Sequence, residues 1–177
     1  LITSLPTNDH RLTLTATVGA GTPGPADGPF ATAQFHRPQG AAVDPSGKAL
    51  WVADTENHLI RRVDLEQQTV STILGTGTQK FDSEPAKSGR QQPLNSPWDL
   101  AIGPATPGGP PRLLIAMAGQ HQLWAMNMMT ATPEVLAGTG GENLRDGPAD
   151  DAALAQPSAL ALDPLAHRLY FADAETS

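Results

Sequence analysis

Residues 38–54 read PQGAAVDPSGKALWVAD, and the same pattern returns 119 residues later as PSALALDPLAHRLYFAD at 157–173. Between these two copies, PWDLAIGP at 97–104 and LLIA at 113–116 give a third version. The repeating unit is therefore roughly 60 residues long, and three such units fill the 177 residues. A fixed period of this kind is typical of arrays in which each unit buries its apolar face against its neighbours.

Each unit is predicted to contain four short strands. In the unit that begins at Pro38, apolar stretches alternate with the turn sequences DPSG at 44–47, TEN at 55–57 and EQQ at 66–68. No window keeps the helical period over the ~10 to 12 residues of an average helix. The pattern predicts an all-β chain of β-propeller blades, each made of four antiparallel strands, with three blades and negligible helix.

The whole chain, 1–177, is expected to form a single propeller region. Its repeat units are 38–96, 97–156, and 157–177 completed by 1–37. Each unit ends in a GAG or GTG sequence that opens a long loop rich in glycine and proline. A phosphate site is not expected there, because the dinucleotide motif needs a helix N-terminus after its glycines. The long loops are residues 19–37, 75–96 and 138–156.

The stretch from Pro38 to Asp64 resembles an NHL repeat. Together with SPWDL at 96–100 and IAMAGQHQLWA at 115–125, it resembles the NHL repeat-containing protein 2 group, which includes bacterial homologues and plant suppressor-of-quenching proteins. The resemblance covers essentially the whole chain. It implies a six-bladed propeller, usually beside a thioredoxin-like domain. The 177 residues contain no cysteine, so the redox chemistry of a CxxC motif is not carried over.

Composition narrows the classes of partner. Eleven lysines and arginines stand against eighteen aspartates and glutamates, which gives a net charge of −7. Nucleic-acid binding draws on clustered basic residues, so no nucleic-acid partner is expected, although some NHL proteins bind RNA through a basic face. No apolar run approaches the ~18 residues of a membrane span, and no membrane partner is expected. The composition does not select a cellular compartment.

Two histidines are the candidate metal ligands. His58 and His121 occupy equivalent repeat positions, and Ser177 takes the third. They could together bind a metal at one rim of the ring. Peptide-amidating lyases, which resemble this architecture, use a histidine-bound metal. Alternatively, each imidazole hydrogen-bonds the turn between the second and third strands of its blade. We favour the structural role and expect no metal or other cofactor.

Aspartates also recur at one position of the repeat. Asp54 and Asp173 end the second strand of two units, and Met117 replaces them in the middle one. A carboxylate there can accept backbone N–H bonds in an Asx-type turn. Among the tryptophans, Trp98 is singled out because it follows the inner-strand proline and would face the mouth of the central channel.

Two functional classes remain open. The favoured one is a non-enzymatic scaffold that binds a protein or peptide through the face formed by the long loops. The long loops carry acidic residues, among them Asp82, Glu84 and Glu142. The loops are expected to gather on one face of the ring, where their charge would favour a basic or neutral partner. The alternative is a metal-dependent hydrolase or lyase at the central channel, with Asp99 and Gln39 as candidates. The binding residues expected for the scaffold are Asp27, Trp98, Asp99, Asp146 and Asp150.

The assembly expected from the alignment is a homodimer. Residues 1–5 align with the third-strand sequence 59–63, and Ser177 aligns with His58. Two chains joined head to tail would complete a six-bladed ring and cover their open strand edges. The alternative is that the chain is half of a longer single-chain propeller.

Overall fold

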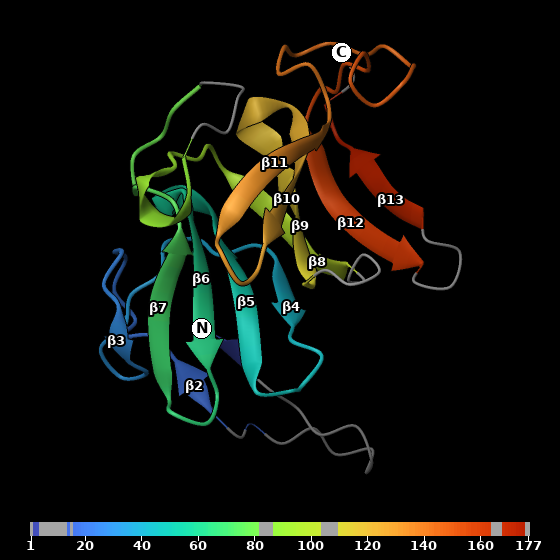
Figure 1. Cartoon of the computed structure of the whole chain (residues 1–177). Helices are drawn as coiled ribbons and strands as arrows, with labels where there is room; N and C mark the ends of the chain where they lie inside the picture. The colour runs from blue at the N-terminus through green and yellow to red at the C-terminus, as the bar shows by residue number, and fades with distance from the viewer. Residues whose placement is uncertain are drawn as a thin grey trace.

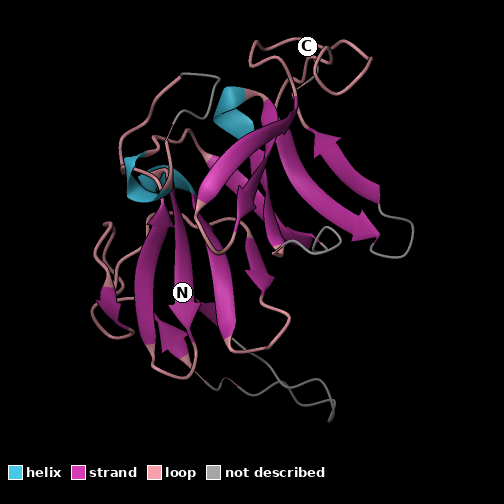
Figure 2. Cartoon of the chain, in the orientation of Figure 1, coloured by secondary structure: helices cyan, strands magenta, loops and turns pink. Residues whose placement is uncertain are grey.

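The computed structural model of the protein describes residues 2–3, 14, 16–81, 87–103, 110–163 and 168–175. Its described elements are antiparallel strands and three single-turn 3-10 helices, so the predicted all-β fold of propeller blades is confirmed (Figure 2). Within the described ranges, no helix is long and apolar enough to cross a membrane.

The first complete blade is a five-stranded sheet in the order β3-β7-β6-β5-β4 (Figure 1). Its strands are β3 (Gly28–Pro29), β4 (Ala41–Val43), β5 (Ala49–Asp54), β6 (Leu59–Asp64) and β7 (Thr69–Leu74). Four of these are the predicted strands, and the 3-10 turn η1 (Thr55–Asn57) connects β5 to β6. The additional strand β3 comes from the long loop 19–37, which turns back along the outer edge of the blade.

The second blade has the predicted four strands in the order β11-β10-β9-β8. They are β8 (Pro97–Gly103), β9 (Arg112–Met117), β10 (Gln122–Asn127) and β11 (Thr132–Ala137). The 3-10 turn η3 (Ala118–Gln120) stands where η1 stands in the first blade, and η2 (Gly89–Gln91) lies in the loop 75–96.

Two further strand pairs complete the described structure. Strand β12 (Pro157–Asp163) pairs with β13 (Arg168–Asp173), and β1 (Ile2–Thr3) pairs with β2 (Thr17–Val18). The inner strand β8 contacts both β4 and β12, so the inner strands of successive units lie side by side.

The main core lies between the first and second blades. Trp51 and Ile60 from the first blade pack with Ile115 and Trp124 from the second. A second cluster, around Val52, fills the opposite face of the first blade beneath the loop 19–37. Because both faces of this blade are covered, its central strand β5 is apolar from Ala49 to Ala53 rather than alternating.

Candidate functional site

The long loops have a defined and repeated backbone. Gly19 N–H donates to the carbonyl of Phe30 at 2.9 Å, and 119 residues later Gly138 N–H donates to the carbonyl of Ala149 at 3.0 Å. Further loop hydrogen bonds recur at the same spacing. The loops 19–37 and 138–156 therefore share one conformation, in which the glycine motif forms a structural turn as predicted.

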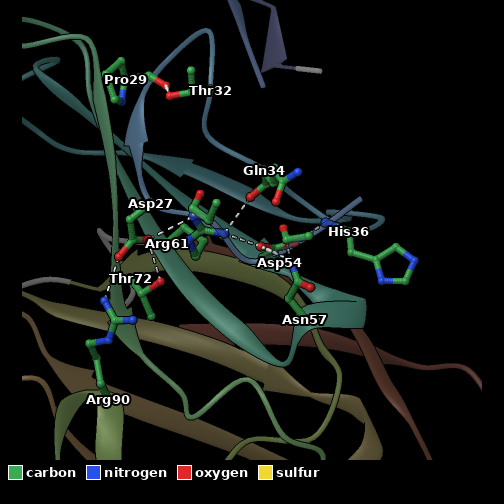
Figure 3. Close-up of polar contacts among 12 residues, drawn as sticks. Asp27, Pro29, Thr32, Gln34, His36, Asp54, Asn57, Arg61, Thr72 and Arg90 are labelled. Carbon is green, nitrogen blue, oxygen red and sulfur yellow. Dashed lines mark hydrogen bonds and ion pairs between the residues drawn. The ribbon is translucent and has the colours of Figure 1, made fainter. Parts of the chain in front are cut away.

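A buried arginine holds the first of these loops. The Arg61 side chain lies on β6 and is fully buried. Its Nη1 donates to Asp54 Oδ2 at 2.7 Å and to the carbonyl of Gln34 at 2.9 Å. Its Nη2 donates to the carbonyl of Ala26 at 2.9 Å and to Asp27 Oδ1 at 3.0 Å (Figure 3). We call Arg61 with these four acceptors the arginine clamp.

Asp27, one of the expected binding residues, is engaged in this clamp. Besides Arg61, it accepts hydrogen bonds from Thr72 Oγ1 at 2.8 Å and Arg90 Nη1 at 2.7 Å. Burial alone would raise the pKa of Asp27, but the hydrogen bonds from Thr72 and Arg90 and the charge of Arg61 outweigh it and lower the pKa. The carboxylate thus joins the loops 19–37 and 75–96 to the first blade.

The recurring aspartates accept backbone hydrogen bonds, but not in a local turn. Asp54 Oδ1 accepts from His36 N–H at 2.7 Å, and Asp173 Oδ2 accepts from Ala155 N–H at 2.8 Å. Both donors lie at the end of the preceding long loop. The acceptor role predicted from the sequence is confirmed, whereas the Asx-turn geometry is wrong because the bond spans 18 residues in each case.

The second blade replaces the charged pair with an apolar one. Met117 stands in the place of Asp54 and Trp124 in the place of Arg61, and both are fully buried. Trp124 Nε1 donates to Gln122 Oε1 at 2.8 Å, so its polar atom has a partner within its own strand. The two positions change together, because a carboxylate without its arginine would be left buried and uncompensated.

The histidines connect one unit to the next. His58 Nδ1 accepts from Ser96 N–H at 3.0 Å, and His121 Nδ1 contacts the carbonyl of Ala155. Both residues adopt the left-handed conformation, with φ of 53° and 54°. Their structural role agrees with the favoured interpretation, but the expected partner was wrong, since each ring contacts the end of a long loop. In the described part of the chain, no three His, Cys, Asp or Glu side chains form a potential metal site.

Burial of His58 predicts a pH dependence. Burial lowers the pKa of His58 below its ordinary value of 6.5, so the unfolded chain takes up a proton before the folded protein does. The free energy of unfolding should therefore fall as the pH drops below about 6.5. Denaturant titrations at pH 7 and pH 5 measure this fall. It should be smaller in His58→Asn, a residue that tolerates the left-handed conformation. An equal fall in both proteins would contradict the assignment.

Asp99 and Trp98 lie at the inner strands. Asp99 Oδ1 accepts from Leu100 N–H and Oδ2 from Leu160 N–H, both at 2.8 Å, so the carboxylate bridges β8 and β12. A Cβ on Gly40, the residue before β4, would lie 2.5 Å from the Asp99 Cα, so the backbone that leads into β4 lies close to β8. Trp98 is half-buried beside it. Both oxygens of Asp99 have backbone donors, and these contacts position adjacent blades.

Asp146 and Asp150 lie on an exposed loop. All residues from 141 to 150 are exposed, and this stretch includes Glu142. The loop runs beside β12 and β13, far from β3 and the neighbouring Asp27 (Figure 1). The structure thus brings Asp146 and Asp150 together on one loop but does not add Asp27 to them. Asp82 and Glu84 lie outside the described residues.

Sequence inspection missed the arginine of the clamp and two side chains, Asn57 and Thr72, that donate to its aspartates. Arg61, Asn57 and Thr72 are buried polar groups, and none was singled out. One signal was available: an arginine interrupts an apolar strand seven positions after the recurring aspartate, and in the next unit both positions turn apolar.

The repeated antiparallel sheets of four or five strands define a repeat protein of the β-propeller class. The NHL repeat family matches residues 35–62. The computed structure is similar to the crystal structure of an auxiliary nutrient binding protein from Bacteroides thetaiotaomicron, with a TM-score of 0.65 and 16% identity. That match covers 75% of this chain and 34% of the other, and at this identity it supports the fold alone.

Curated relatives confirm the resemblance seen in the sequence. The chain is 42% identical over 179 residues to NHL repeat-containing protein 2 of Homo sapiens, which covers 90% of this chain and 24% of the relative. It is 40% identical over 159 residues to Protein SUPPRESSOR OF QUENCHING 1, chloroplastic, of Arabidopsis thaliana, which covers 89% of this chain and 15% of the relative. The chain therefore spans about a quarter or less of the length of these two relatives.

Proposed function

We propose that this chain is an interaction scaffold that binds a basic protein segment or peptide through the loop 138–156. The observation that carries the proposal is that an ordered loop presents exposed carboxylates. Residues 141–150 are all exposed, yet backbone hydrogen bonds such as Arg145 N–H to the carbonyl of Ala153 at 3.1 Å define their path. A rigid loop loses little conformational entropy on binding, which favours recognition.

The surface next to this loop offers room for a ligand. A shallow hollow of about 320 Å³ is lined by backbone and side chains of β11 and of the loop, including Val135, Thr139 and Asp150. Glu142 and Asp146 are further exposed carboxylates on the same loop. A basic side chain with an apolar stem suits such a surface, because its stem covers apolar atoms while its charge faces the carboxylates.

Selection from a random peptide library displayed on phage tests the proposal. We expect the selected peptides to be enriched in lysine and arginine. Changing Glu142→Gln and Asp150→Asn together should weaken their binding by about three- to tenfold, since exposed charge pairs contribute about 0.2–1 kcal/mol each. Added salt should weaken it further.

Glu66→Gln is the matched control, because Glu66 is an exposed carboxylate in the β6–β7 turn, 3.0 Å from Lys48. This variant should bind the selected peptides as the unmodified protein does. Peptides without a basic bias, or equal losses in Glu66→Gln and in the loop variant, would contradict the proposal. The contributions of Trp98 and Asp99 to binding, and the homodimer that completes a ring, stay predictions.

The hydrolase or lyase alternative gains no specific support from the geometry. Asp99, its main candidate, has a backbone N–H on each carboxylate oxygen. Gln39 N–H donates to the carbonyl of Ala53 at 3.2 Å, within the first blade. The scaffold is therefore the function that the described residues support best.

A further inference from the structure

The loop 138–156 closes as a small hairpin. Arg145 and Ala153 exchange both of their backbone hydrogen bonds, with the Arg145 N–H donating at 3.1 Å and the Ala153 N–H at 3.0 Å. Between them, the Asp151 N–H donates to the carbonyl of Pro148 at 2.9 Å. The residues from 146 to 152 therefore form a turn whose two ends are held together by the backbone.

The side chain of Arg145 adds hydrogen bonds across this turn. Its Nε donates to the carbonyl of Asp151 at 3.0 Å, and its Nη2 donates to the same oxygen. Both residues are exposed, so these bonds lie at the surface. A planar guanidinium suits this role, because its rigid fork loses less side-chain freedom for each hydrogen bond formed.

The corresponding loop of the first blade shows what these hydrogen bonds replace. There Thr32 stands in the place of Asp151, and Ala26 stands in the place of Arg145. The Thr32 Oγ1 donates to the carbonyl of Pro29 at 3.3 Å and so stabilises its own turn. An ionised carboxylate can only accept hydrogen bonds, so Asp151 cannot make this contact. Arg145 provides a donor from the other side of the turn instead.

Arg145 leaves the carboxylates of the turn without an internal cation. Asp150 and Asp151 are both exposed. Within the residues that the structure describes, neither of them takes part in an ion pair. The nearby guanidinium donates to a backbone carbonyl, although a carboxylate is the stronger acceptor for arginine. The negative charge of Asp150 and Asp151 is therefore available to a ligand.

The exposure of these two positions does not depend on where the loop stands in the chain. The loop 19–37 lies on a complete blade, and there the counterparts of both carboxylates are exposed as well. These counterparts are Ala31 and Thr32. Asp146 is not included with the two carboxylates, because its counterpart Asp27 is held in the arginine clamp.

We propose that Arg145 is a positioning residue, which fixes the turn so that Asp150 and Asp151 meet a basic ligand in one arrangement. The inference rests on the scaffold function proposed above and identifies the residue that preorganises the binding loop. A turn that is fixed before binding loses less conformational entropy when the ligand arrives. Arg145 acts through the backbone of the loop rather than by contact with the ligand.

Arg145→Lys tests this role, because it keeps the charge and removes the two-donor fork. Fluorescence anisotropy measures the binding of a library-selected peptide whose affinity falls in Glu142→Gln/Asp150→Asn. We expect Arg145→Lys to weaken this binding about three- to tenfold, since the turn must then be ordered as the peptide binds. In the free protein, the backbone amides of Asp151 and Ala152 should exchange with solvent faster. The free energy of unfolding should not change, because Arg145 is exposed.

Arg145→Gln separates the positioning role from an effect of charge. Removing a positive charge from an acidic surface would by itself tighten the binding of a basic peptide. Exposed charges contribute little, so we expect the loss of the hydrogen bonds to dominate and this variant to bind more weakly. Tighter binding by Arg145→Gln would overturn the proposal. Unchanged affinity in Arg145→Lys, or unchanged amide exchange, would overturn it as well.

Arg62→Lys is the matched control, because Arg62 pairs with Asp64 at 2.9 Å on the surface of the first blade. It should change neither the peptide affinity nor the exchange of the loop amides. The outcomes also separate this inference from the scaffold proposal. A library that yields no basic peptides refutes both. Peptides that respond to Glu142→Gln/Asp150→Asn but not to Arg145→Lys refute the role of Arg145 alone.

Discussion

Replacing Arg61 by methionine is expected to lower the free energy of unfolding by about 3–5 kcal/mol, measured by denaturant titration. The substitution keeps most of the side-chain volume but removes the positive charge. It leaves Asp54, which is fully buried, without its cation, and it releases the carbonyls of Ala26 and Gln34. The large effect follows from the uncompensated buried charge rather than from the net contribution of the ion pair.

Arg62 provides a matched control on the same strand. Its side chain is 35% exposed and pairs with Asp64 at 2.9 Å at the surface. Arg62→Met should cost no more than about 1 kcal/mol, because exposed ion pairs contribute little. Similar losses in the two variants would show that the clamp is not what stabilises the first blade.

The second blade suggests how part of this loss can be recovered. Adding Asp54→Met to Arg61→Met removes the buried carboxylate and imitates Met117. The double variant should therefore be more stable than Arg61→Met alone, although the N–H of His36 and the loop carbonyls lack their partners. Hydrogen exchange should show the loop 19–37 opening more readily in both variants, since the clamp attaches it to β6.

Replacing Trp124 by alanine is expected to cost about 3–5 kcal/mol in the free energy of unfolding. Trp124 is fully buried in the core between the two complete blades, where it packs with residues such as Trp51 and Ile115. Alanine would leave a large cavity in a region that strands from both blades hold in place, so little collapse can fill it. The same denaturant titration measures the loss.

Trp98→Ala is the control for residue type. Trp98 is half-buried at the start of β8, so its removal should cost distinctly less than that of Trp124. Equal costs would mean that the two side chains contribute equally to the core, which would contradict the burial seen in the structure. A small cost also makes Trp98→Ala suitable for testing whether this residue contributes to binding.

The two units differ in how they solve the same structural problem. In each blade, the second and third strands place two facing side chains beneath a long loop. One blade fills these places with Asp54 and Arg61, and the next fills them with Met117 and Trp124. Burying the charged pair costs desolvation free energy, but its directed hydrogen bonds attach a specific loop to the blade.

The sequence by itself determined the architecture. Short apolar runs that are separated by turns and repeated at a fixed spacing have few ways of burying their apolar surfaces. Turns and apolar runs correctly identified β4 to β7, and the 119-residue offset correctly paired β4 and β5 with β12 and β13. The resemblance to NHL repeats correctly placed the chain among its relatives. Local turn chemistry also predicted that Asp54 and Asp173 accept backbone hydrogen bonds.

Only the tertiary structure decided which polar residues meet. Asp27 and Asp54 approach Arg61 from 34 and seven positions away in the chain, and Arg90 reaches Asp27 across 63 positions. No periodic pattern reports such distant pairings, so the bonds of Asp27 to Arg61, Thr72 and Arg90 were not predicted. The partners of His58 and His121 were wrongly predicted for the same reason. They lie on loops whose path depends on the packing of the blades. Repetition fixes the strands, whereas long-range contacts between loops and blades fix the polar network.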